Sequence, residues 1–63
     1  MTHDQKEWAK SQDWYVTSAK TLSGNWIVYV QPKAGETPDL ELMVGTPVMQ
    51  YADYPMLLAW AGF

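Results

Sequence analysis

The chain has 63 residues, a formal net charge of −3 and no cysteine. This length allows one small domain, residues 1–63, and the lack of cysteine excludes a disulfide scaffold and thiolate metal sites. Because four tryptophans occur in so short a chain, we expect large aromatic side chains to supply most of the core.

The sequence has no feature of a targeting or membrane segment. Its first residues are polar, and its longest apolar-rich region, residues 42–63, is interrupted by glycine, proline, Gln50 and Asp53. A signal peptide needs a continuous apolar stretch, and a membrane span needs about 20 mostly apolar residues. The sequence therefore predicts a cytoplasmic protein that does not enter a membrane.

The first expected element is a short helix over residues 3–11. Thr2 and Gln5 have the spacing of a capping box, in which each side chain bonds the backbone N–H of the other residue. Trp8 is the only large apolar residue of this segment, so we expect it to anchor the helix to the rest of the domain.

A β-hairpin is expected next. Residues 14–20 and 26–31 are rich in aromatic and β-branched residues, which suit a half-buried strand. The residues between them, 21–25, include serine, glycine and asparagine, which tolerate the backbone angles of a turn. Along the second strand Trp26 and Val28 fall on one face, which we expect to be the core face.

A third strand is expected over residues 39–44, after a loop at 32–38 that contains two prolines. Its alternation places Leu40, Leu42 and Val44 on one face and Asp39, Glu41 and Met43 on the other.

The last segment has two interpretations. Proline follows Thr46 and also follows the Asp53–Tyr54 pair, and proline near the first helical position is typical of a helix start. These signals predict two short helical turns, or one helix kinked at Pro55, with Gly62 as the C-terminal cap. The alternative for residues 48–51 is a fourth strand.

Together these elements predict an α+β fold. It consists of a short N-terminal helix, a three-stranded antiparallel sheet and C-terminal helical turns on one face of the sheet. The alternative is a small all-β barrel.

The sequence has no recognisable catalytic, cofactor or metal motif. It has one histidine and no cysteine, and its serines and glycines fit neither a nucleophile motif nor a phosphate-binding loop. The acidic group Glu36, Asp39 and Glu41 lacks the ligand spacing of a calcium loop. We therefore expect no enzyme activity, no cofactor and no bound metal.

Nucleic acid is an improbable partner for this composition. Aromatic residues of the hairpin, such as Trp14 and Tyr29, resemble a base-stacking surface. However, the chain is acidic and has no arginine, whereas phosphate neutralisation supplies most of the affinity for nucleic acid. Single-stranded nucleic acid is therefore the last of the alternatives.

The C-terminal segment, residues 56–63, is the main candidate for a binding surface. It has no polar side chain, so a helix here needs cover on several sides, although scattered exposed apolar residues are also common. Carboxylates are the only charged groups from residue 34 onward. The candidate partner-binding residues are Glu36, Asp39, Glu41, Asp53, Leu58, Trp60 and Phe63.

These features predict a non-enzymatic protein-interaction module. The expected partner is a larger protein that offers an apolar patch with a basic rim. Small acidic proteins with this profile include regulators and inhibitors, some of them encoded by phages. The alternative is a homodimer in which the C-terminal segments of two copies cover each other.

Overall fold

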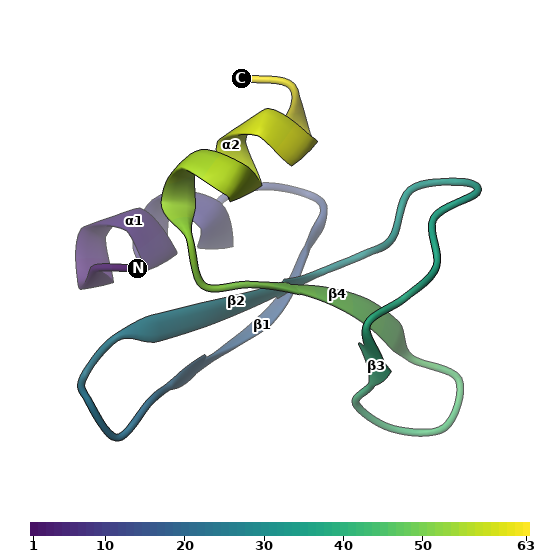
Figure 1. The fold of residues 1–63 in the computed structure, drawn as a ribbon, viewed down its shortest axis with the longest axis horizontal. Helices are drawn as coiled ribbons and strands as arrows, with labels where there is room; N and C mark the ends of the chain where they lie inside the picture. The colour runs from purple at the N-terminus through teal and green to yellow at the C-terminus, as the bar shows by residue number, and fades with distance from the viewer.

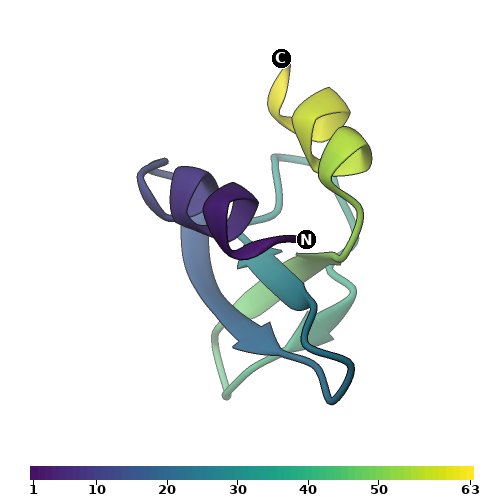
Figure 2. The ribbon, with the colours of Figure 1, turned by 90° about the vertical axis from the view of Figure 1, so that its left-hand side faces the viewer.

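The computed structural model describes residues 1–63 and contains two helices and a four-stranded antiparallel sheet (Figure 1). The strand order is β1-β2-β4-β3, and both helices lie on one side of the sheet (Figures 1 and 2). The α+β class is confirmed, with four strands rather than three, and the open sheet differs from the alternative of a closed barrel. The elements are α1 (His3–Lys10), β1 (Tyr15–Lys20), β2 (Trp26–Val30), β3 (Leu40–Glu41), β4 (Pro47–Tyr51) and α2 (Tyr54–Ala61).

Helix α1 begins at the predicted capping box. The Thr2 hydroxyl accepts a hydrogen bond from the Gln5 N–H at 3.2 Å, and the Gln5 side-chain oxygen accepts one from the Thr2 N–H at 3.0 Å. Two of the N–H groups at the start of the helix are thereby satisfied. Ala9 is fully buried and Trp8 is half-buried, so this end of the helix packs on the domain.

Strands β1 and β2 form the predicted hairpin. They pair antiparallel from Tyr15 opposite Val30 to Lys20 opposite Trp26. The register shifts between Tyr15 and Thr17, and this irregularity brings Tyr15 against the core, although simple alternation groups it with Thr17 on the other face. A β-bulge has this effect because its extra residue reverses the side-chain alternation beyond it.

Residues 47–51 form strand β4, so the prediction of helical turns from residue 46 is wrong and the alternative strand is correct. β4 pairs with β2 on the side opposite β1, with Val30 facing Met49. Pro47 is the first residue of the strand, a position where the absence of an N–H is tolerated. The proline therefore marks the start of a strand. Residues 47–51 form this strand because they pair with the side of β2 that β1 leaves free.

Strand β3 is shorter than predicted. It contains only Leu40–Glu41 and pairs with the beginning of β4, whereas the alternation predicted a strand over residues 39–44. The Glu41 carboxylate accepts a hydrogen bond from the Gly45 N–H at 3.1 Å, which closes a loop directly after the strand. Residues 42–44 are consequently exposed in this loop instead of contributing to the core.

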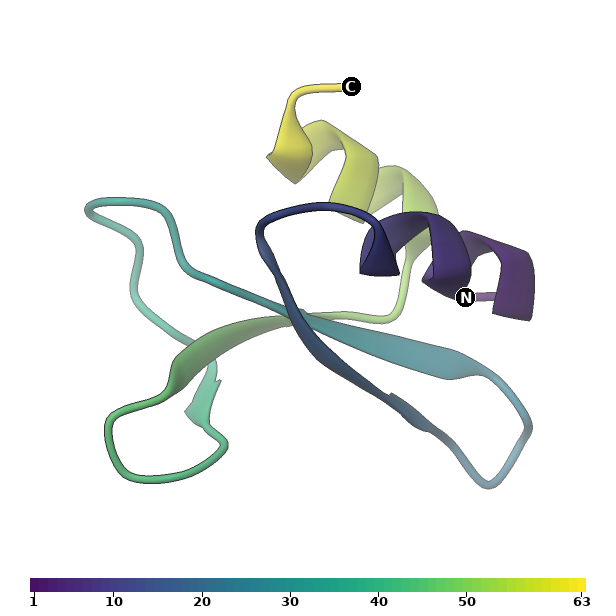
Figure 3. The same cartoon turned by 180° about the vertical axis from the view of Figure 1, so that it is seen from behind.

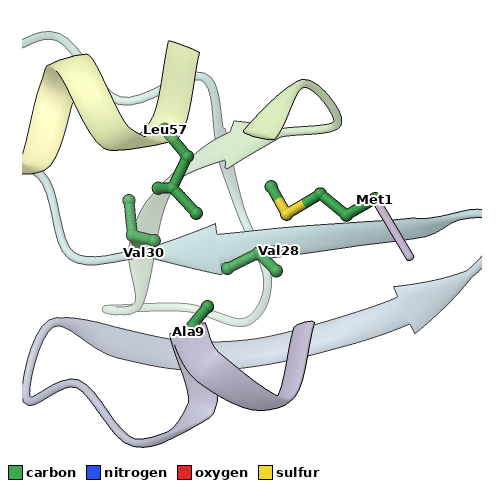
Figure 4. Close-up of a cluster of buried hydrophobic side chains, with 5 residues drawn as sticks. All are labelled: Met1, Ala9, Val28, Val30 and Leu57. Carbon is green, nitrogen blue, oxygen red and sulfur yellow. The ribbon is translucent and has the colours of Figure 1, made fainter. Parts of the chain in front are cut away.

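The core lies between the sheet and the two helices, and its fully buried part consists of aliphatic side chains rather than the expected aromatic ones (Figure 4). Val28 and Val30 project from β2 toward Ala9 of α1 and Leu57 of α2, and all four are fully buried. The cluster is completed by Met1, whose ammonium group donates to the carbonyls of Trp26 and Ala52.

Larger aromatic rings surround this core, and we call six of them the aromatic array. In each contacting pair the ring centroids lie between 5.2 and 6.0 Å apart, and most pairs meet edge to face, the arrangement that the ring quadrupole favours. The array joins both helices to β4 and to the start of β1, so it provides much of the contact between the layers. Its members are Trp8, Trp14, Tyr51, Tyr54, Trp60 and Phe63.

Candidate functional site

Helix α2 carries the predicted caps at both ends. The Asp53 side chain accepts a hydrogen bond from the Met56 N–H at 3.3 Å, and Pro55 occupies the first turn. Gly62 has a φ of 92°, and the next N–H, that of Phe63, bonds the Leu58 carbonyl at 2.9 Å. This C-terminal motif satisfies carbonyls that the helix leaves free and fixes the direction in which Phe63 leaves it.

The inner side of α2 is well packed. Leu57 is fully buried against the valines of β2, and Trp60 is half-buried. The Trp60 ring meets the Trp14 ring edge to face at 5.4 Å and the Tyr51 ring at 5.8 Å. Leu58 is half-buried as well. Two of the apolar residues predicted for binding, Leu58 and Trp60, therefore have part of their surface packed inside the domain.

The outer side of α2 remains apolar and exposed. Met56 is 61% exposed and Phe63 is 72% exposed, and Pro55 and Ala59 of the same helix are exposed as well. We call these four residues the outer α2 surface. Helix α2 has no acidic residue in its first turn and no basic residue in its last, and none of its side chains is charged.

Phe63 is held in place although it is exposed. Its ring meets the Trp8 ring edge to face at a centroid distance of 5.2 Å and an interplanar angle of 78°. The residue therefore has one edge on α1 and the rest of its surface toward solvent. A partner that binds it would find a ring whose orientation is already restricted, which lowers the entropy lost on binding.

Glu36 lies beside α2 and binds Trp60 rather than projecting freely. The indole N–H of Trp60 donates to both carboxylate oxygens, at 2.9 and 3.0 Å, and the Lys33 N–H donates to one of them at 2.7 Å. These hydrogen bonds, that of Trp60 first, lower the pKa of Glu36 below its usual value. The loop at residues 32–38 is thereby attached to the helix.

Lys33 strengthens the same attachment through the face of the Trp60 ring. Its ammonium lies 4.8 Å from the centroid of the Trp60 ring and donates to the Trp60 carbonyl. A cation over an indole face is attracted by the ring quadrupole. We call Lys33, Glu36 and Trp60 together the loop clasp.

The other predicted acids also bond the backbone. Asp39 accepts from the Gln50 N–H at 2.9 Å, and Glu41 accepts from Gly45 as described above. Both belong to the β3 side of the sheet, whereas Glu36 and Asp53 lie at α2 (Figure 1). The structure therefore divides the four carboxylates into two pairs, and only the pair Glu36 and Asp53 lies next to α2.

Tyr51 lies between these two pairs. Its pKa is raised above the usual value, mainly because the phenol is partly buried and further because the carboxylates of Glu36 and Asp39 are near. A negative phenolate is disfavoured in both circumstances. The phenol therefore stays neutral where proteins normally function.

A second exposed apolar site was not among the residues selected from the sequence. Met43 is 69% exposed and Val44 is 99% exposed in the loop between β3 and β4, and Leu42 precedes them. The alternating pattern of residues 39–44 concealed this loop because it is equally typical of a strand. The signal that could have revealed it is Gly45, whose φ of 86° permits the loop to close.

The hairpin aromatics do not form a common stacking surface. Trp14, Tyr15 and Trp26 pack against the core on the helix side of the sheet, whereas Tyr29 lies on the opposite face, opposite Thr17 of β1. The molecule also has no group of three or more histidine, cysteine or acidic side chains placed to hold a metal ion. Neither helix has the length and apolar character needed to cross a membrane.

Comparison with protein-family models, with curated proteins and with solved structures finds no match to this chain.

Proposed function

We propose that this chain is a non-enzymatic, cytoplasmic protein-interaction module that binds a larger protein through the outer α2 surface. The observation that carries the proposal is a helix without any charged side chain that keeps Met56 and Phe63 mostly exposed. Its inner side is already buried, so the exposed side is left for another molecule. Contiguous exposed apolar residues on a small protein often mark such a contact.

The residues around the outer α2 surface hold it in a fixed conformation, which supports its role as a preformed binding surface. The caps fix the ends of α2, the Trp8 ring orients Phe63, and the loop clasp holds Trp60. Binding to such a surface orders few additional side chains, which leaves more of the contact energy for affinity.

The charges near α2 indicate what surrounds the partner's apolar patch. Glu36 and Asp53 adjoin the helix, and each carboxylate has acceptor positions beyond those used inside the domain. A basic rim on the partner would complement them and would accelerate association. A small acidic protein that covers an apolar patch of this kind fits the role of a regulator or inhibitor.

The proposal is tested by capture of a partner from the source cell's lysate, followed by titration of the purified partner with variants. Met56→Glu and Phe63→Asp should each weaken binding about thirtyfold or more, because large apolar anchors often contribute 2 kcal/mol or more. Met56 lies in the first helical turn, where a negative charge is favourable, so the fold should persist.

Leu22→Glu is the matched control, because it also replaces a fully exposed apolar residue by an acid, but in the β1–β2 loop. It should bind like the unaltered protein. Equal affinity of Met56→Glu, Phe63→Asp and Leu22→Glu would contradict the proposal. Met43→Glu, measured in parallel, shows whether the apolar loop after β3 is the binding surface instead.

A symmetric homodimer through the same surface is the second candidate. Ala59 lies between the two large residues Met56 and Phe63, so two antiparallel copies could approach closely at Ala59 with Met56 facing Phe63 of the other copy. No charge on the helix opposes this contact. Sedimentation velocity across a concentration series decides this point, since a homodimer should become a monomer in Met56→Glu but not in Leu22→Glu.

A further inference from the structure

Strand β1 is at the margin of the sheet, and its outer side has no neighbouring strand (Figures 2 and 3). In an antiparallel pair, alternate residues direct their N–H and C=O groups toward the neighbour and away from it. The Thr21 N–H bonds the Asn25 carbonyl at 2.7 Å, which makes Thr17 and Ala19 the residues that bond β2. Ser18 and Lys20 then direct their backbone groups outward.

These outward groups have no hydrogen-bond partner within the molecule. No loop, helix cap or side chain bonds the backbone of Ser18 or Lys20 from the outer side. Ala19 and Lys20 are exposed and Ser18 is half-buried, so the edge is accessible. An extended segment could pair here by the main-chain hydrogen bonds that define strand addition.

The free edge is short and carries a single positive charge. The register shift between Tyr15 and Thr17 ends it on one side, and the hairpin loop ends it on the other. Lys20 is the only charged residue of β1. A bulge and an edge lysine both discourage indiscriminate pairing, so a segment that binds must compensate for the lysine.

We propose that the outer edge of β1 binds a short, extended, acidic segment of another protein as a fifth strand. The backbone groups of Ser18 and Lys20 form the main-chain hydrogen bonds, and a carboxylate of the segment lies opposite the Lys20 ammonium. This surface is separate from the outer α2 surface, and the inference does not depend on the function proposed for that surface.

A second copy of the chain complements this edge poorly. Its own β1 would bring another lysine and no carboxylate. Its β3 edge has only two residues, and the adjacent carboxylates of Asp39 and Glu41 already bond backbone amides within the hairpin. The charge distribution therefore favours an acidic partner.

The test uses a blocked seven-residue peptide in which valine alternates with glutamate, titrated into the ¹⁵N-labelled protein. At saturation the amides of Ser18 and Lys20 should shift, and their hydrogen exchange should slow at least tenfold. A peptide of the same sequence with N-methyl groups at alternate positions cannot complete the ladder and should have no effect. Equal effects of both peptides, or no change at these two amides, would overturn the proposal.

Lys20→Glu provides the charge test. It should weaken binding of the valine–glutamate peptide roughly fivefold to tenfold and improve binding of a valine–lysine peptide, because an exposed attraction is replaced by a repulsion of similar size. Lys10→Glu makes the same charge change on α1 and should leave both affinities unaltered. Slowed exchange at Ser18 and Lys20 that grows with protein concentration alone would instead identify a second copy as the occupant.

Discussion

The two hairpins of this sheet are held together in different ways. The β1–β2 hairpin pairs at five positions, and its inner face is covered by helices and the aromatic array. The β3–β4 hairpin pairs at only two positions, Leu40 with Val48 and Glu41 with Pro47. The Glu41 carboxylate bonds the N–H of Gly45 in its loop, and the Asp39 carboxylate bonds the N–H of Gln50 in β4.

This difference shows how a small domain can keep part of its surface available. In the β1–β2 hairpin, which is held by packing, the apolar side chains of the inner face are buried in the core. Where carboxylates hold the backbone instead, the apolar residues Leu42 and Met43 remain exposed. Regions of a protein with few buried contacts also open more easily than the core. We therefore expect the β3–β4 hairpin to open locally without unfolding the rest of the domain.

The largest effect that tests this contrast is expected from Leu57→Ala. Leu57 is fully buried between α2 and β2, so its truncation should reduce the free energy of unfolding by about 2–5 kcal/mol. That is enough to unfold much of a domain this small. Val48→Ala in the second hairpin removes less apolar surface and should cost about 2 kcal/mol. Urea unfolding followed by circular dichroism measures both, and a larger loss for Val48→Ala would reverse the comparison.

A smaller effect is expected at the glycines of the two hairpin loops. Gly24 and Gly45 have φ values of 91° and 86°, and alanine at either position has free space but an unfavourable backbone conformation. Each substitution should cost about 1 kcal/mol. Gly24→Ala should lower the free energy of global unfolding. Gly45→Ala should instead accelerate amide exchange only in β3 and its loop. Indistinguishable exchange patterns in the two variants would show that the hairpins open together.

The smallest effect concerns the loop clasp and depends on pH. The pKa of Glu36 is lowered by its hydrogen bonds in the folded protein, so its ionised form stabilises the fold above the usual pKa of 4.5. This stabilisation is lost as the pH falls below 4.5 and passes through the lowered pKa of Glu36 in the folded protein. Glu36→Gln should therefore destabilise the protein slightly at pH 7 and flatten the decline below pH 4.5. Glu41→Gln, whose carboxylate bonds only a loop amide, is the control, and an identical acid profile for both variants would argue against the clasp.

Local sequence signals predicted those elements that are specified locally. The capping box at Thr2, the cap at Asp53 and the turn at 21–25 depend on neighbouring residues, and all three are found. Strand β4 was assigned wrongly because its Thr46–Pro47 start is locally ambiguous. Its identity is set by β2, which lies far away in the sequence, and periodicity within one segment contains no such information.

The candidate site was predictable in part for the same reason. Because residues 56–61 include no polar residue, the sequence indicated that one side of the helix at α2 would remain apolar and uncovered by the domain. Which side chains face outward depends on how the helix docks, and Met56 rather than Leu58 is the exposed one. Likewise, Trp60, which bonds Glu36, lies 24 residues away from it, and Gln50, which bonds Asp39, lies 11 residues away, beyond the reach of motif spacing.

The aromatic array also gives the protein an intrinsic optical signal. Three of its tryptophans, Trp8, Trp14 and Trp60, follow one another through edge-to-face contacts that cross from α1 to α2. Rings fixed in asymmetric surroundings produce near-ultraviolet circular dichroism, which disappears when packing becomes fluid even if secondary structure persists. A spectrum in this region should therefore report whether α2 is docked, without any added label that could cover the surface it presents.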